Sequence, residues 1–147
     1  MKNENKLKVY SLKKNDTEFE NRQIKSSKDA VDYIRQFYSD DIEIYESFFL
    51  LMLNRSLKTI GYVKISQGGI FGTVVDPIIV AKYAVDSLST NIILAHNHPS
   101  GQTRPSEADK AITEKIKQGL KFFDITVSDH VILTKDSHFS FSDEGIL

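Results

Sequence analysis

Two histidines, a serine and an aspartate stand close together near the middle of the chain, in a spacing that suits metal binding. His96 and His98 follow the apolar run 92–95, which is typical of a buried strand. Alternate residues of a strand share a face, so the two imidazoles would point the same way, with Cα atoms about 7 Å apart. Proline and glycine then break the strand, and Ser106 has the chemistry of a helix N-cap, with Asp109 on the same helical face. Two imidazoles and one carboxylate can therefore meet at one point.

This set of residues matches the ligands of a catalytic zinc site. The chain has no cysteine, so a metal ion would have to be held by imidazole and carboxylate groups. Catalytic zinc typically has three protein ligands and leaves its fourth position to water, whose pKa falls to about 7. His96, His98 and Asp109 supply three ligands. We therefore expect one Zn²⁺ in an open site of the hydrolase type rather than a structural site.

Hydrolysis of a carbonyl compound also needs a base for the proton of the attacking water and a donor for the oxyanion. Glu46 interrupts an otherwise apolar predicted strand and is the candidate base. Ser106, at the junction of loop and helix, is the candidate donor. Glu43 lies three residues before Glu46 and on the opposite face of that strand. The residue pattern alone does not choose between the two glutamates.

Each of these residues also has an ordinary structural explanation. A lone strand histidine is usually structural, but the His-x-His pairing favours metal ligation. Ser106 and Asp109 equally form a capping box, and the serine could serve both purposes. His130 and His138 lie on late predicted strands, where a structural role is the better interpretation, although Asp129 and His130 could form a pair behind a metal ligand.

Composition places the chain among ordinary globular proteins. It has 147 residues, of which 40% are hydrophobic and 27% charged, with a net charge of −1. Such a chain is long enough for one domain that buries roughly two-thirds of its unfolded surface. No apolar run approaches the roughly 20 residues of a membrane span, and no apolar stretch follows the charges near Met1. We therefore expect a cytoplasmic protein without a membrane partner.

The near-neutral charge does not support nucleic acid as a partner, because duplex DNA usually selects a clustered excess of Lys and Arg. The exception is the beginning of the chain, where basic residues outnumber acidic ones. We predict a basic leader over residues 1–25, most simply a solvated one, in which residues 7–12 could add a strand. The main domain is then expected over residues 26–147.

Apolar periodicity and capping signals predict the elements that must position the site. In chain order these are a helix from Ser26 or Ser27 to about 39–41, strands over 42–53 and 57–65 with a turn at 54–55, a short stretch over 70–75, a helix after Asp76 and Pro77, a strand over 92–95, a helix over 107–120, and strands over 125–127, 130–134 and 139–141.

The buried faces of the later helices follow from the same periodicity. They are expected to be Ile79, Val80, Tyr83, Ala84 and Leu88 for the second helix, and Ala108, Ala111, Ile112 and Ile116 for the third. The order of elements implies a mixed β-sheet packed between helices, an α/β or α+β fold. Glu46 can reach the histidines only if its strand lies beside theirs.

The site residues belong to a longer pattern. His96-Asn97-His98-Pro99-Ser100-Gly101, followed by Pro105-Ser106 and Asp109, meets the pattern H-x-H-P-x(6)-S-x-x-D without a gap. It resembles the signature of the RadC-like proteins, a bacterial branch of the JAMM (MPN/JAB) metalloprotease superfamily. Residues 46–54, 69–73, 128–132 and 140–145 are similar to further segments of that family, so the resemblance covers about residues 26–147.

The resemblance implies a JAB/MPN architecture, related to that of cytidine deaminases, and a single zinc ion. It makes His96, His98 and Asp109 the ligands, Glu46 rather than Glu43 the general base, and Ser106 the oxyanion stabiliser. It also implies hydrolysis of a peptide or isopeptide bond in a peptide or protein substrate.

Two departures from the family pattern bear on partners. Full-length RadC proteins have a helix-hairpin-helix module before this domain, and the chain is too short to include it, which weakens an inference of DNA binding. Residues 78–79 are both isoleucine, where many relatives carry a charged pair, so partner contacts there are expected to differ.

A competing hypothesis is a DNA-repair-associated accessory protein of the RadC family, with vestigial or unknown catalysis. A nuclease is a poorer explanation, because nucleases named for the letters His-Asn-His separate them widely in sequence. A zinc nucleobase deaminase needs a P-C-x-x-C motif, which a chain without cysteine cannot supply. The identity of the substrate and the oligomeric state are left open by the sequence.

Overall fold

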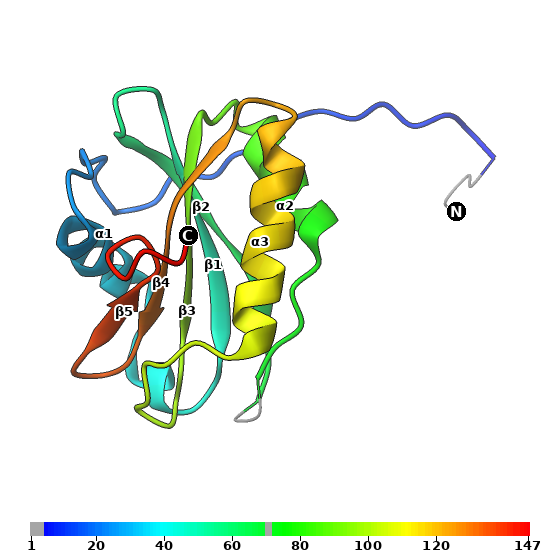
Figure 1. Cartoon of the computed structure of the whole chain (residues 1–147). Helices are drawn as coiled ribbons and strands as arrows, with labels where there is room; N and C mark the ends of the chain where they lie inside the picture. Colours follow the sequence, from blue (N-terminus) through cyan, green and yellow to red (C-terminus); the bar gives the residue numbers. More distant parts are fainter. Residues whose placement is uncertain (1–4, 70–71) are drawn as a thin grey trace.

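A five-stranded mixed sheet, covered by helices on both faces, forms the body of the protein, as predicted (Figure 1). The computed structural model describes residues 5–69 and 72–147. Its elements are α1 (Ser27–Ile34), η1 (Arg35–Phe37), η2 (Asp40–Glu43), β1 (Ser47–Leu53), β2 (Thr59–Gln67), α2 (Pro77–Asp86), β3 (Asn91–Asn97), α3 (Glu107–Lys121), β4 (Thr126–Leu133) and β5 (His138–Ser140). The strand order is β2-β1-β3-β4-β5, with β3 and β4 parallel and the other neighbours antiparallel.

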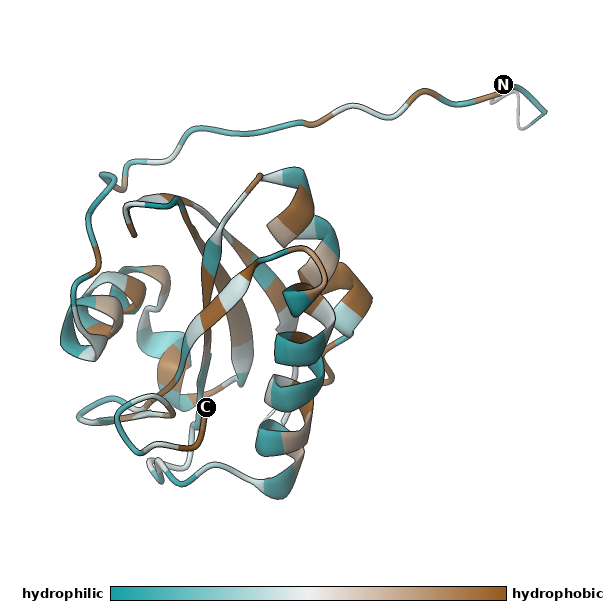
Figure 2. Cartoon of the chain, turned by 45° about the horizontal axis from the view of Figure 1, so that its top comes forward, coloured by the Kyte–Doolittle hydropathy of each residue, from teal (hydrophilic) through white to brown (hydrophobic). Residues whose placement is uncertain are grey.

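Side-chain alternation divides the core into two layers. Odd-numbered residues of β1, such as Phe49 and Leu51, pack under α1, whereas even-numbered ones, such as Leu50, pack under α2 and α3. All seven residues of β1 are buried, which explains its continuous apolar run. The central strands are hydrophobic, while α3 carries hydrophilic residues on its outward turns (Figure 2).

The register between β1 and β3 determines which side chains can meet at the sheet end. Phe48 is opposite His96 in this antiparallel pair. The arrangement that Glu46 needs in order to reach the histidines, with its segment beside theirs, is therefore confirmed. His96 lies on the α3 side of the sheet, together with Phe48 and Leu94.

The segment before β1 differs from the prediction. The strand expected over residues 42–53 begins only at Ser47, because residues 40–43 form a 3-10 turn. The Asn97 amide donates to the carbonyl oxygens of Ile42 and Tyr45, both at 2.7 Å, and so holds this segment in a bend. Glu46 thus precedes the strand instead of interrupting it. The expectation that Glu43 and Glu46 occupy opposite faces of one strand was wrong.

The second helix begins as predicted, with the Asp76 carboxylate capping the N–H of Ile78 and Pro77 in the first turn. Its predicted buried face was too wide, because only Val80 and Ala84 are buried. Leu88 is 84% exposed. The helix ends at Asp86, and Leu88 adopts a left-handed φ of 55°, which turns its side chain away from the core.

The third helix also spans nearly its predicted range, from Glu107 to Lys121. Ile116 is buried and Ile112 half-buried, as expected, but Ala108 and Ala111 are exposed. Thr113 and Leu120 take inward positions that were not predicted. The core-facing stripe is therefore rotated away from the two alanines.

The ends of the chain bring further differences. The strands predicted over 125–127 and 130–134 are one strand, β4, with a register shift opposite Ile92 and Ile93. Residues 7–12 belong to no strand and lie in an extended segment that leads away from the sheet (Figure 1). Part of the stretch predicted over 70–75, namely residues 70–71, lies outside the described residues.

Among the helices that the structure describes, none has the length and apolarity to cross a membrane.

Candidate metal centre

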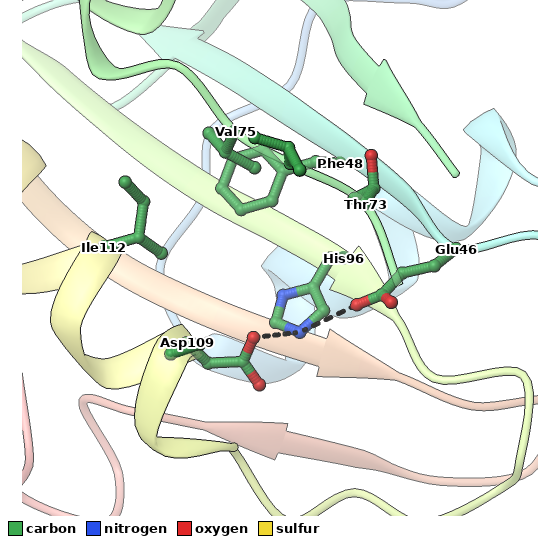
Figure 3. A pocket seen from close by; sticks show the side chains of 9 residues that line it. Glu46, Phe48, Thr73, Val75, His96, Asp109 and Ile112 are labelled. Carbon is green, nitrogen blue, oxygen red and sulfur yellow. Dashed lines mark ion pairs between the residues drawn. The ribbon is translucent and has the colours of Figure 1, made fainter. Parts of the chain in front are cut away.

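Four side chains converge at one end of the sheet. His96 is the last but one residue of β3, and His98 follows β3 directly. Asp109 lies in the first turn of α3, and Glu46 precedes β1 (Figure 3). One ligand atom from each lies within 4.8 Å of all the others. The Nε2 atoms of His96 and His98 are 3.0 Å apart, and each is 3.4 Å from an Asp109 carboxylate oxygen. The Glu46 carboxylate is 3.8 Å from His96 Nε2.

The start of α3 positions Asp109. Ser106 Oγ accepts the N–H of Asp109 at 3.0 Å, and the Asp109 carboxylate accepts the N–H of Ser106 at 2.8 Å. This reciprocal capping box confirms the structural alternative considered for these residues. The same carboxylate faces both histidines. The helix cap therefore orients Asp109 without removing it from the cluster.

A chain of hydrogen bonds behind His96 fixes the tautomer of its ring. The Thr113 hydroxyl donates to the Asp109 carbonyl oxygen at 2.6 Å, so its only hydrogen is used. It must then accept from His130 Nδ1, also at 2.6 Å. His130 Nε2 is left as an acceptor, and His96 Nδ1 donates to it at 2.7 Å. Neutral His96 thus presents an unprotonated Nε2 to the cluster.

The ring of His98 is fixed in one tautomer in the same way. Its Nδ1 donates to the Gln102 carbonyl oxygen at 2.8 Å, so its Nε2 is also an acceptor in the neutral ring. Two imidazole lone pairs and two carboxylates then face one point. Acceptors in this arrangement repel each other unless a cation lies among them. The residues therefore fit a divalent metal ion such as Zn²⁺, which takes imidazole and carboxylate ligands with their second ring nitrogens hydrogen-bonded.

Burial and charge shift the pKa values of the cluster in the directions that such a site needs. Burial raises the pKa of Glu46, against the lowering effect of His96 and His98. Burial also acts to raise the pKa of Asp109, but the effect of the two histidines beside its carboxylate outweighs burial and holds that pKa well below its usual range. Burial lowers the pKa of His130, and the neighbouring His96 acts in the same direction. His130 therefore stays neutral, as its acceptor role toward His96 requires.

The net pKa shift of His98 is upward, although burial acts to lower it. The hydrogen bond with Asp109 and the carbonyl of Gln102 outweigh burial, and the charges of Asp109 and Glu46 add to the effect. The two carboxylates around His98 therefore favour positive charge at this point of the cluster.

The other predicted residues have separate roles. Asp129 does not pair with the His130 ring; its carboxylate accepts from the Ser140 hydroxyl at 2.6 Å and from the backbone N–H groups of His130 and Ser142. It ties the C-terminal segment to β4. His138 is exposed on β5 and does not belong to the four-residue cluster.

Sequence reasoning missed two residues that position the site, Thr113 and Asn97. Asn97 is fully buried, and its side-chain oxygen accepts the N–H of Ser47 at 2.8 Å while its amide holds the segment that carries Glu46. A polar residue inside a buried strand was the available signal. Thr113 offered no such signal, because threonine is common on exposed helix faces.

Two glycines allow the chain to pass close to Glu46. Gly68 donates its N–H to the Glu46 carbonyl oxygen at 2.8 Å, and a Cβ on Gly68 would lie 1.8 Å from the Gly72 carbonyl oxygen. Gly72 itself has a φ of +115°, which L-residues rarely adopt, and a Cβ there would approach the Glu46 carboxylate to 3.0 Å. Gly68 and Gly72 can therefore lie this close to each other and to Glu46 because neither carries a side chain.

Two adjoining pockets give access to the cluster. One, of about 250 Å³, is bordered by Glu46, His96 and Asp109; the other, of about 410 Å³, is bordered by Glu46, His98, Ser106 and Asp109. The predicted catalytic and ligand residues thus all line one open depression. Their individual roles stay predictions.

Comparison with known proteins places the chain in a family. The model of the RadC-like JAB domain matches residues 24–146. The chain is 43% identical over 125 residues to a UPF0758 protein of Flavobacterium johnsoniae, covering 85% of the chain and 54% of that protein. It is 42% identical over 102 residues to the UPF0758 protein YfjY of Escherichia coli, covering 69% and 64%, and 41% identical over 103 residues to a UPF0758 protein of Porphyromonas gingivalis, covering 69% and 45%. The chain spans about half the length of these relatives, and their names state no activity.

Proposed function

The chain belongs to the RadC-like JAB domain family, and on this basis we propose that it is a zinc-dependent hydrolase, a metallopeptidase that cleaves a peptide or isopeptide amide. The observation that carries the proposal is the convergence of two imidazole Nε2 atoms and two carboxylates on one point beside an open depression. This donor set has the composition of catalytic zinc sites rather than closed structural ones.

In this proposal His96, His98 and Asp109 hold the ion. Bound there, zinc would supply Lewis acidity toward the substrate carbonyl and lower the pKa of the attacking water. The hydrogen bonds from His96 to His130 and from His98 to Gln102 leave both Nε2 atoms free to act as ligands.

Glu46 is the proposed general base. It is half-buried at the border of both pockets, and burial raises its pKa, which brings it closer to the neutral range in which a proton shuttle works well. Glu46 accepts the proton of the attacking water and delivers it to the leaving amine. Glu43 lies on the 3-10 turn and is exposed, within 3.7 Å of Lys135, so it is not assigned a role.

Ser106 is the proposed oxyanion donor. Its oxygen accepts the N–H of Asp109, and among the residues that the structure describes no acceptor is recorded for its hydroxyl hydrogen. That hydrogen is therefore available to the pocket that Ser106 shares with Glu46 and His98.

The test compares Glu46→Gln with Glu43→Gln, a matched change three residues away. We expect both variants to bind zinc near a 1:1 ratio, measured by metal analysis and titration of the apoprotein. Turnover of a peptide library, followed by mass spectrometry, should fall about 100-fold or more in Glu46→Gln and stay unchanged in Glu43→Gln.

Three results would count against parts of this proposal. A wild-type protein that holds no zinc after zinc is supplied would remove its basis. Loss of zinc in Glu46→Gln alone would make Glu46 a ligand. Equal loss of turnover in both variants would contradict the assignment of the base.

A further inference from the structure

The smaller of the two pockets has a distinct chemical character. Beyond the three cluster residues and Thr73, its lining is entirely apolar, and it consists of Phe48, Val74, Val75, Ala108 and Ile112. We call these five residues the apolar pocket. Figure 3 shows His96 between the carboxylates of Asp109 and Glu46, with Phe48, Val75 and Ile112 beyond it. Apolar surface thus begins directly beside the reactive point.

The walls of the apolar pocket are held by separate elements. Phe48 is only 2% exposed, and its ring stacks on that of His96, with centroids 5.9 Å apart and planes inclined by 10°. Ile112 lies on α3 one turn after Asp109, and Val75 lies just before the cap of α2. Phe48 therefore forms a buried floor, while Ile112 and Val75 are only half-buried and retain area that an apolar group could cover.

We propose that the apolar pocket receives an apolar side chain of the substrate, on a residue flanking the amide that is cleaved. The inference rests on the proposed function and names the class of its substrate. The whole first pocket, cluster residues included, has a volume of about 250 Å³. This is smaller than typical sites for whole drug-sized ligands, which begin at roughly 300 Å³, so its apolar part suits a single side chain. The Glu46 carboxylate at its border disfavours an acidic side chain.

The neighbouring pocket is bordered by His98, Ser106 and Gly72 in addition to residues shared with the first. It contains polar groups where the first has Phe48, Val75 and Ile112. A substrate chain that crosses the cluster would therefore place unlike residues on the two sides of the scissile bond, with the apolar one fixed by the first pocket.

The first experiment uses the zinc-loaded protein and three hydroxamates as probes, those of N-acetyl-leucine, N-acetyl-glycine and N-acetyl-aspartate. The hydroxamate group chelates zinc, so the three differ only in the side chain offered to the pocket. We expect calorimetry to show the leucine probe binding about tenfold or more tightly than the glycine probe, with the aspartate probe weakest. Equal affinities for all three would overturn the pocket proposal and leave the zinc site intact.

Two matched substitutions on α3 test where the leucine side chain of the probe binds. Ala108→Phe fills the apolar pocket from its border, whereas Ala111→Phe adds the same ring to an exposed position of the same helix outside it. The preference for leucine should vanish in Ala108→Phe and persist in Ala111→Phe, with zinc content unchanged in both. If the preference for leucine persists in Ala108→Phe, the leucine side chain of the probe binds outside the apolar pocket.

A second readout does not depend on zinc. In the metal-free protein, N-acetyl-leucinamide should shift the methyl resonances of Val75 and Ile112, and N-acetyl-aspartamide should not. Equal or absent shifts at these methyl groups would overturn the pocket proposal. If the protein holds no zinc but the leucine probe still shifts them, the proposed function fails while the apolar pocket stands.

Discussion

At the scale of single residues, the site depends on which ring nitrogen of each histidine carries the hydrogen, as well as on the ligand atoms themselves. Thr113 has one hydroxyl hydrogen, and its donation to the Asp109 carbonyl oxygen forces His130 and then His96 into defined tautomers. His130 is fully buried and hydrogen-bonds His96 and Thr113, but it is not one of the four side chains that converge on the cluster. It is therefore a positioning residue rather than a ligand.

Thr113→Val tests this chain of hydrogen bonds. The valine keeps the shape of the side chain but removes both bonds, so His130 and His96 are no longer fixed in one tautomer. We expect zinc affinity to fall about 10- to 100-fold, as is usual when groups behind a ligand are lost. Competition with a chelator of known affinity measures the change.

Thr59→Val is the matched control. Thr59 is also buried and hydrogen-bonded, to Arg22 and Tyr33, but it pairs with Leu53 at the far end of β1. The Thr59→Val substitution should reduce thermal stability without altering zinc affinity. A similar loss of affinity in both variants would show that Thr113 acts only through the stability of the fold.

At the scale of elements, the first turn of α3 combines two tasks. Its capping box stabilises the helix, and the same turn presents Asp109 to the histidines and Ser106 to the pocket. Because both tasks share one serine, a simple loss of activity on mutation would not separate them. Substitutions that differ in capping strength can.

Ser106→Ala should lower the free energy of unfolding by about 1 kcal/mol, the usual cost of a lost N-cap. Ser106→Gly should cost only a few tenths of a kcal/mol, because glycine is a tolerable cap, yet it removes the hydroxyl equally. We therefore expect both variants to lose turnover to the same extent while differing in denaturant midpoint. If turnover instead follows stability, so that Ser106→Gly is nearly as active as the wild type, then Ser106 acts only as a helix cap.

At the scale of the whole molecule, the body of the fold begins before the predicted boundary at residue 25. The ring of Phe19 packs against Phe37 and Tyr62, with centroids 5.6 and 5.8 Å away. Ile24 is 6% exposed and belongs to the core under α1. Residues 5–17, by contrast, are exposed along their whole length.

Two truncations separate these parts of the leader. Removal of residues 1–17 should leave the melting temperature and zinc content unchanged, because the described part of this segment, residues 5–17, is exposed. Removal of residues 1–25 should lower the melting temperature, since it deletes Ile24 and Phe19 from packed positions. Calorimetric scans of both proteins measure the difference.

Equal melting temperatures for the two truncations would contradict the packed role of residues 19–24. Salt-dependent DNA binding that disappears with residues 1–17 would favour the competing, DNA-associated role of the protein over a purely hydrolytic one.

The sequence by itself determined the features whose physics is local. Alternation along β3, the cap before α2 and the capping box of α3 involve residues at most a few positions apart, and each formed as predicted. The pattern of His96, His98, Ser106 and Asp109 could be read for the same reason. The family resemblance added Glu46, which the residue pattern alone could not choose over Glu43.

Only the tertiary structure decided what depends on packing between distant segments. The bend that Asn97 imposes on residues 42–45 moved Glu46 out of the strand, and the register of β1 against β3 brought it to His96. The contact of Thr113 with His130 and the walls of the apolar pocket likewise join α3 to β4 and to β1. Such contacts depend on which strands are neighbours and in what register, and no short window of sequence contains that information.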